Sequence, residues 1–248
     1  MTDVAHPGLL PAPPQRLLPT ASSRAAAVAL SMLTVLHLVA QVAEASAWAR
    51  VTQGTLMPLL AVTLWCAAPA PRSRLVRLVL VALGLSWLGD TAPAAFSGDA
   101  AFLVMVGFFL LAQVAYVVAF WPTRAHSVAR RPVLLLPYAV AAVALVAACA
   151  PGAGPLLAAV VVYGVCLVTM AVLATGVHPL AGVGGAVFLA SDAMIALGAF
   201  TDWFAPPASG FWVMLTYVAG QALVVAGVLA RSSSQVPGSG TGVKPSRS

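Results

Sequence analysis

The stretch Leu180–Phe200, LAGVGGAVFLASDAMIALGAF, is an apolar run that contains a single carboxylate, Asp192. At about 1.5 Å per residue, a helix of this length crosses a hydrocarbon layer of about 30 Å, so the run is interpreted as a transmembrane helix. A carboxylate deep in such a helix costs about 2.5 to 3.5 kcal/mol on insertion scales, so it normally faces a protein interior or a wet cavity. Asp192 is therefore a candidate site residue. The alternative interpretation is a structural polar contact between helices.

The composition of the whole chain agrees with this interpretation. Hydrophobic residues make up 61% of the 248 residues, charged residues only 7%, and the mean hydropathy is +1.00, which excludes an ordinary soluble domain. The three cysteines lie in apolar runs without CxxC or Cys/His spacing, so neither a disulfide framework nor a metal site is predicted. The net charge of +6 would suggest nucleic acid in a soluble chain. In a membrane protein its placement matters more, and no nucleic-acid partner is predicted.

The chain divides into a membrane domain between two tails. Residues 1–24, with five prolines among the first 20, are predicted to be a flexible cytoplasmic tail, and the Ser/Gly/Pro-rich residues 231–248 a disordered one. Residues 25–230 are predicted to be an all-α membrane domain with eight transmembrane helices. The expected spans are 25–43, 56–70, 75–93, 101–121, 133–150, 155–175, 180–200 and 211–230. The second is short and bounded by prolines.

The first span has an alternative interpretation as a cleaved signal peptide, because residues 45–47, Ala-Ser-Ala, resemble a signal-peptidase site. Two features oppose it. The apolar run exceeds the roughly 7 to 15 residues usual for such a peptide, and polar groups interrupt its outer half. We therefore expect the segment to stay in the protein.

The positive charges predict the orientation of the eight spans. With a cytoplasmic N-terminus, the tails and the even-numbered connections hold 11 of the 12 Lys and Arg residues, and only Arg50 lies outside. A model with seven or nine spans would break this alternation. The count therefore predicts that both termini are cytoplasmic, in a multi-pass protein of the cell membrane.

Several polar groups are predicted to share one level of the membrane. Counting about 1.5 Å per residue from the cytoplasmic ends places Asp192 about 18 Å and Asp90 about 22 Å up. Tyr163 and Tyr217 fall within a few ångströms of that band. Asp90 also lies near a helix end, where the alternative is a carboxylate that simply reaches water.

The first span carries a polar stripe at helical spacing. Thr34, His37, Gln41 and Glu44 should all turn toward the interior that Asp192 faces. By itself, His37 is interpreted as a hydrogen-bonded core residue rather than as a proton carrier.

Several short motifs follow one another in a fixed order along the chain. They are Thr52–Pro58, Trp87–Asp90, Phe102–Gln113 with Tyr116 and Phe120, Tyr163–Met170, Phe188–Asp192, and Tyr217 with Gln221. In this order and spacing they resemble the motifs of the YhhN-like lysoplasmalogenase family. The resemblance extends over nearly the whole membrane portion, and two Asp motifs in an eight-helix frame are its most specific part.

The resemblance implies an integral membrane hydrolase that uses no cofactor and no metal. Its substrate would be a lysophospholipid of the bilayer, an alkenyl-glycerophosphoethanolamine or -choline, cleaved at the vinyl ether to a fatty aldehyde and a glycerophospho-amine. The matched carboxylates are Asp90 and Asp192. Side chains that would orient substrate or water are Gln113, Tyr116, Tyr163, Tyr217 and Gln221. The chain departs from the family pattern at Gln53, where many members have Lys, and at Gln113, where many have His.

Two carboxylates suit this chemistry. Acid hydrolysis of a vinyl ether begins with protonation of the β-carbon, and water attacks the resulting oxocarbenium ion. One desolvated carboxyl group can donate that proton, while a second, ionised one stabilises the cation and takes a proton from water, as in glycoside hydrolysis. We expect Asp192 to be the acid and Asp90 the base or cation stabiliser, with the reverse order as the alternative.

Two other classes of function fit the same residues. A small proton-coupled transporter would also place acids inside the membrane. Spans three and seven each carry an Asp, and spans four and eight each carry a Val-Met pair followed by a Gln, so a 4+4 parallel pseudo-repeat is predicted, as some transporters have. No span has the central Gly/Pro break of a discontinuous carrier helix. The third class is a lipid-binding membrane protein without catalysis.

Overall fold

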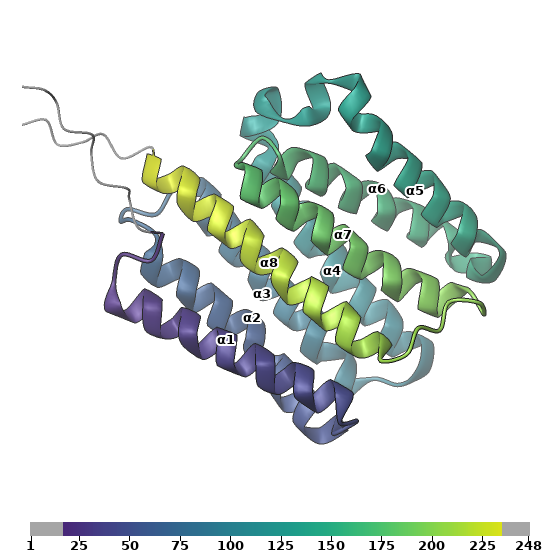
Figure 1. Ribbon diagram of the computed structural model, residues 1–248. Helices are drawn as coiled ribbons and strands as arrows, with labels where there is room; N and C mark the ends of the chain where they lie inside the picture. Colours follow the sequence, from purple (N-terminus) through teal and green to yellow (C-terminus); the bar gives the residue numbers. More distant parts are fainter. Residues whose placement is uncertain (1–16, 235–248) are drawn as a thin grey trace, which may run out of the picture.

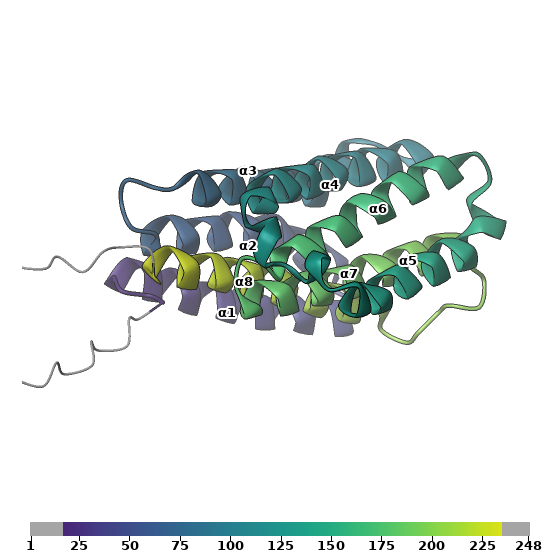
Figure 2. The same cartoon turned by 90° about the horizontal axis from the view of Figure 1, so that it is seen from above.

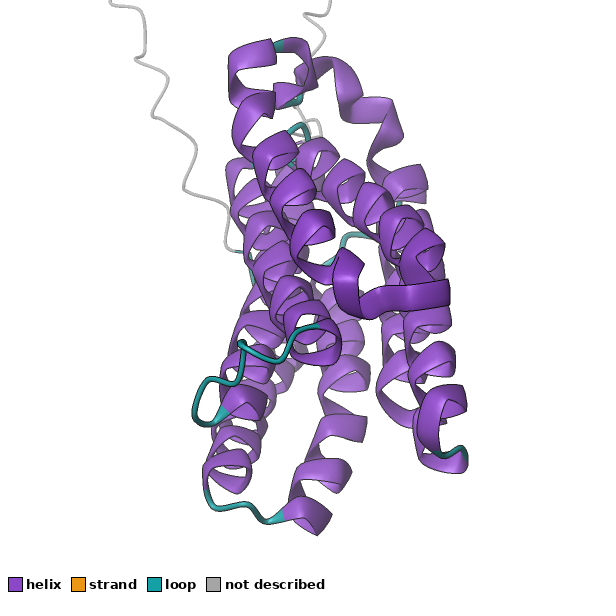
Figure 3. Ribbon diagram, turned by 90° about the vertical axis from the view of Figure 1, so that its right-hand side faces the viewer, coloured by secondary structure: helices purple, strands orange, loops and turns teal. Residues whose placement is uncertain are grey.

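The computed structural model describes residues 17–234, which form a bundle of α-helices joined by short loops (Figures 1 and 3). The eight α-helices are α1 (Ala21–Val42), α2 (Ser46–Ala67), α3 (Arg74–Thr91), α4 (Gly98–Phe120), α5 (Pro132–Ala153), α6 (Leu157–Ala174), α7 (Pro179–Phe200) and α8 (Ser209–Ser234). Four short 3-10 helices connect them: η1 (Ala92–Ala95), η2 (Trp121–His126), η3 (Val128–Arg130) and η4 (Gly154–Leu156). The all-α prediction is confirmed. The two ends of the described chain lie at the same end of the bundle (Figures 1 and 2).

Six helical segments are long and apolar enough to cross a membrane. They are α1, α3 with η1, α4 with η2, a continuous stretch from α5 through η4 to α6, α7, and α8. The second helix, α2, is not among them. Segments of this length and composition are those of a membrane protein.

The helix α2 differs most from its prediction. It was expected over residues 56–70 but begins at Ser46, ends at Ala67 and contains Pro58. A proline has no N–H, so the carbonyl of Gly54, four residues earlier, loses its intrahelical donor. The indole Nε1 of Trp87 on α3 donates to this carbonyl at 2.8 Å. A helix can therefore continue through the proline, because the neighbouring helix supplies the missing bond.

Other boundaries shift by a few residues at the ends of the bundle. The first helix begins at Ala21, because Thr20 and Ser23 form a reciprocal capping box. The last helix continues to Ser234, into the stretch that was expected to be a tail. The rest of the two predicted tails, residues 1–16 and 235–248, lies outside the described residues.

Helices α7 and α8 pack with their backbones in direct contact. A Cβ atom at Gly184 would lie 2.6 Å from the backbone nitrogen of Val224, and one at Gly220 would lie 2.8 Å from that of Phe188. Small residues allow this approach in membrane helices. The close packing fixes the position of α7, which carries Asp192, against α8, which carries Tyr217.

Replacing Gly220 by Ala is therefore expected to lower the stability of the bundle. The added methyl group meets backbone atoms, which cannot turn away, so an overpacking cost of about 1 to 3 kcal/mol is expected. The measurement is the midpoint of thermal unfolding of the purified protein in detergent. Gly107→Ala is the matched control, because nothing lies within 4 Å of its added Cβ. Equal midpoints for the two variants would contradict this packing.

The two halves of the chain share part of their contact pattern. In each half consecutive helices pack on one another, α1 to α4 in the first and α5 to α8 in the second. However, α5 also packs on α7, whereas α1 and α3 make no comparable contact. The 4+4 pseudo-repeat stays a prediction.

Candidate functional site

The carboxylates of Asp90 and Asp192 line one cavity of about 690 Å³. Asp90 lies in the last turn of α3, and Asp192 lies in the second half of α7. The other walls come from α1, α2, α4, α8 and the connection between α7 and α8. Thus the structure brings together the two acids that the sequence places at one level. The volume falls in the range typical of small-molecule sites.

Both oxygens of Asp90 accept a hydrogen bond from a neighbouring helix. Gln53 of α2 donates through Nε2 to Oδ1 at 3.2 Å, and the hydroxyl of Tyr217 on α8 donates to Oδ2 at 2.9 Å. The preceding residue, Gly89, lets α4 come close, since a Cβ there would lie 2.8 Å from the ring of Phe109. Asp90 is therefore held from two sides while it faces the cavity.

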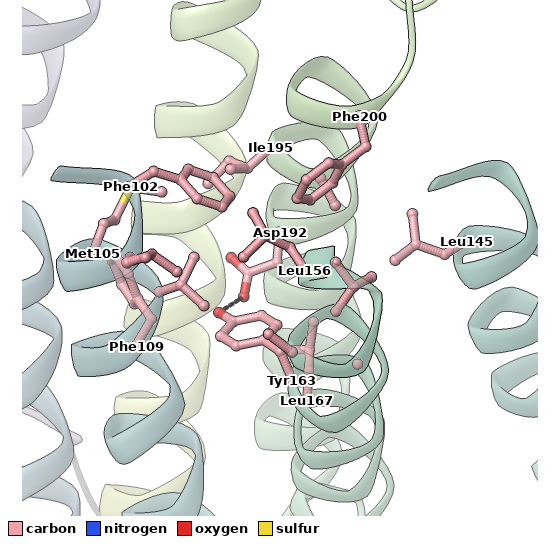
Figure 4. Close-up of a pocket in the computed structure, with 16 residues that line it drawn as sticks. Phe102, Met105, Phe109, Leu145, Leu156, Tyr163, Leu167, Asp192, Ile195 and Phe200 are labelled. Atoms are coloured by element: carbon pink, nitrogen blue, oxygen red, sulfur yellow. Dashed lines mark hydrogen bonds between the residues drawn. The ribbon is translucent and has the colours of Figure 1, made fainter. Parts of the chain in front are cut away.

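Asp192 is nearly buried, with 6% of its surface exposed, and accepts one hydrogen bond. The hydroxyl of Tyr163 on α6 donates to its Oδ2 at 2.5 Å (Figure 4). Its neighbour Ser191 donates to the backbone carbonyl of Val213 at 3.0 Å, which ties α7 to α8 at this level. The second carboxyl oxygen, Oδ1, makes no hydrogen bond to the described residues.

A second, apolar cavity has a volume of about 70 Å³. Asp192 is also in the lining of this cavity (Figure 4). Apolar side chains of α4, α5, α6 and α7 line it, among them Phe102, Leu145, Leu167 and Phe200. Asp192 is in the lining of both cavities, whereas Asp90 lines only the larger one. The carboxyl group of Asp192 therefore lies between a small apolar cavity and a larger cavity that also holds the polar groups of Asp90, Gln53 and Tyr217.

Three of the predicted substrate-orienting residues lie outside both linings. The hydroxyl of Tyr116 donates to Oε1 of Gln221 at 2.5 Å, and Nε2 of Gln221 donates to Ser86 at 3.2 Å. Gln113 is fully buried, and neither polar atom of its amide makes a hydrogen bond, although the amide lies beside the hydroxyl of Tyr163. By contrast, Tyr163 and Tyr217 each line a cavity and bond a carboxylate.

The polar stripe of α1 turns inward only in part. His37 is fully buried, with Nδ1 2.8 Å from the hydroxyl of Thr52 and Nε2 3.3 Å from the amide of Gln41. It is thus a hydrogen-bonded core residue, and Gln41 lines the larger cavity. For Glu44 the prediction is wrong: this residue lies beyond the end of α1, is exposed and has a φ of 52°.

The sequence analysis did not predict the hydrogen bond from Gln53 to Asp90, and it predicted no metal site. In the sequence Gln53 is a departure from the family pattern, and its position in the Thr52–Pro58 motif is the signal that could have placed it beside Asp90. Among residues 17–234, no three His, Cys, Asp or Glu side chains gather closely enough to hold a metal ion.

Comparison with known proteins identifies the family. No curated protein and no solved structure matches the chain. The family model described as the YhhN family matches residues 48–228, which is well over half of the chain. The matched range contains both carboxylates of the cavity and every residue that donates a hydrogen bond to them. The chain therefore belongs to the YhhN family.

Proposed function

We propose that this protein is a membrane-embedded hydrolase that cleaves the vinyl ether bond of lysoplasmalogens. One observation carries the proposal: Asp192 lies in the lining of both a small apolar cavity and a larger cavity that also holds Asp90, Gln53 and Tyr217. In a lysoplasmalogen the vinyl ether is the junction between the hydrocarbon chain and the polar glycerophosphate. Membership in the YhhN family supports the same reaction, because the motifs of this chain resemble those of the YhhN-like lysoplasmalogenases.

The proposed setting is the cell membrane, with all eight α-helices crossing it and both termini in the cytoplasm. The 22 residues of α2 are long enough to span, and α2 packs between α1 and α3. Nearly all Lys and Arg residues then fall on the cytoplasmic side, which agrees with the excess of positive charge that cytoplasmic loops of membrane proteins carry. In this topology Asp90 and Asp192 lie in the outer half, just below the headgroups.

The first step transfers a proton from Asp192 to the substrate. The carbon that accepts it, the β-carbon, is on the chain side of the vinyl ether, so the acid must stand next to the apolar compartment. Asp192 does so, whereas Asp90 does not. Tyr163 holds Oδ2, which leaves Oδ1 to carry the proton. The O–H bond of Asp192 and the π bond of the C=C group break, a C–H bond forms, and the positive charge is shared by the ether oxygen and its adjacent carbon.

The second step is the addition of water to that adjacent carbon. This carbon is on the polar side of the bond, which the cavity holding Asp90 would enclose. The two donors on Asp90, Gln53 and Tyr217, favour an ionised acceptor, and an anion there stabilises the cation. Water gives one proton to Asp90 as its oxygen bonds to the carbon, and a hemiacetal results.

The third step releases the products and restores both acids. The hemiacetal hydroxyl gives its proton to Asp192, while Asp90 returns its proton to the glycerol oxygen as the C–O bond breaks. A fatty aldehyde and a glycerophospho-amine leave, and the sum of the three steps is the addition of one water. Gln113 lies beside the hydroxyl of Tyr163, and Tyr116 bonds Gln221, so these three residues would act as positioning residues rather than contact the substrate.

The test compares three lysolipids with the same headgroup and chain length, joined by an alkenyl ether, an alkyl ether or an ester. The purified wild-type protein is expected to release aldehyde from the alkenyl lipid only, because only its C=C bond can accept a proton on carbon. Ethanolamine and choline headgroups are both tested. The proposal would be contradicted if neither alkenyl lipid released aldehyde, or if the ester lipid released fatty acid. Lipid flux across liposomes without cleavage would favour a transporter.

A further inference from the structure

A large groove at the other end of the bundle carries two arginines. It has a volume of about 820 Å³ and lies between η2, η3, the start of α5 and the last turns of α6. Arg124 and Arg130 line it together with Trp121, while Leu135, Val168 and Val172 supply apolar surface. This end is opposite to that of Asp90 and Asp192, so the groove belongs to neither cavity described above.

The arginines of the groove have no acidic neighbours in the described part of the chain. The five carboxylates of residues 17–234 all lie toward the opposite end: Glu44, Asp90, Asp99, Asp192 and Asp202. The guanidinium of Arg124 lies 5.1 Å from the ring of Trp121 and donates to its backbone carbonyl at 3.2 Å. A guanidinium has five N–H donors, so most of the donors of Arg124 are free for an anion.

The wall that carries these arginines is fixed against α6. The backbone nitrogen of Val128 donates to the hydroxyl of Thr175 at 3.0 Å. Gly176 lies so close to the same wall that a Cβ there would be 2.5 Å from the carbonyl of Thr123. Ser127 adds a bond to the carbonyl of Arg124 at 2.7 Å. The backbone that carries the two arginines is therefore held in place, so a bound ligand would have to order only their side chains.

We propose that this groove binds an anionic phospholipid of the membrane leaflet at this end of the bundle. Its phosphate contacts Arg124 and Arg130, and the first part of a chain lies on Leu135, Val168 and Val172. A groove with a basic rim and an apolar floor matches an amphipathic anion better than a soluble one. Arginine and tryptophan together are typical of the level of lipid headgroups, and basic pockets between membrane helices bind anionic lipids. The site is independent of the proposed reaction.

The test is lipid binding by the full-length protein in detergent, measured by native mass spectrometry. Phosphatidylglycerol is expected to bind about tenfold more tightly than phosphatidylcholine with the same chains, which corresponds to about 1.4 kcal/mol. The Arg124→Gln/Arg130→Gln protein should lose this preference. Arg74→Gln/Arg77→Gln is the matched control, because it removes two charges from α3 at the same end and should keep the preference.

Two further arms distinguish a lipid site in the groove from general attraction to surface charge and from a site for soluble phosphate. Ala129→Trp fills the groove without changing its charge, and it should weaken phosphatidylglycerol binding as well. Millimolar glycerol 3-phosphate should not displace the lipid, because it lacks the chains. The proposal is overturned if the control pair loses as much affinity as the groove pair, if Ala129→Trp binds normally, or if the soluble phosphate competes fully. None of these readouts depends on aldehyde release.

Discussion

Replacing Asp192 by Asn is expected to lower aldehyde release by at least about 10²- to 10⁴-fold, the contribution typical of a general acid. An amide cannot donate a proton to carbon, so the first step stops. The protein should still fold, because the Asn side-chain oxygen can accept the hydroxyl of Tyr163 in place of the carboxylate. The measurement is initial-rate aldehyde formation from an alkenyl lysolipid, coupled to an aldehyde dehydrogenase.

The matched control for this variant is Asp202→Asn. Asp202 is exposed in the connection between α7 and α8, so the same chemical change there should leave the rate unaltered. An Asp192→Asn protein with the thermal midpoint of the wild type and a near-normal rate would refute the role assigned to Asp192. In heavy water, the wild type should place one deuterium on the carbon next to the aldehyde group, which reports the proton transfer directly.

Asp90→Asn is expected to lose activity by a comparable factor, but for a different reason. This variant keeps the acid and loses the anion that stabilises the cation and accepts a proton from water. A small anionic nucleophile needs no base and can enter a cavity of about 690 Å³. Added azide should therefore restore consumption of the lysolipid by Asp90→Asn and not by Asp192→Asn. Lysolipid remaining is measured by mass spectrometry.

The pattern of rescue distinguishes the two orders of acid and base. If azide rescues Asp192→Asn instead, the roles are exchanged. If azide rescues neither variant while both keep the wild-type thermal midpoint, Asp90 is not the group that activates water. Tyr217→Phe serves as the milder control, because it removes one of the two donors to Asp90 and leaves the carboxylate and Gln53 in place.

The fold was predictable wherever a helix must present apolar side chains to lipid. The run 180–200 was expected, and α7 is Pro179–Phe200, since such a helix is apolar along its whole length. The first half of α2 was not predicted to be helical, because polar residues interrupt it. There the polar side chain of Thr52 bonds His37 of α1, and that of Gln53 bonds Asp90 of α3. A hydropathy count measures how polar each residue is but does not show whether its side chain faces a neighbouring helix or the lipid.

The sequence was sufficient to predict the depth of the site residues along their helices, but not which face of each helix turns inward. A constant rise per residue was enough to place Asp90 and Asp192 at one level, and the structure gives them a common cavity. Which face each helix turns inward depends on packing between helices that are distant in sequence. Depth alone therefore could not show that Gln53 donates to Asp90, or that Tyr116 bonds Gln221 away from both cavities.

The bond from Trp87 to the carbonyl of Gly54 has a consequence for the way sequences in this family can change. The acceptor is a backbone atom that every amino acid supplies, so the hydrogen bond does not depend on which residue occupies position 54. Instead, the hydrogen bond ties two other residues together: Pro58, which removes the intrahelical donor, and Trp87, which replaces it. If Pro58 were replaced, the backbone N–H of the new residue could donate to the carbonyl of Gly54, and Trp87 would no longer be needed as the donor. If Trp87 alone were replaced, this carbonyl beside the site would have no donor.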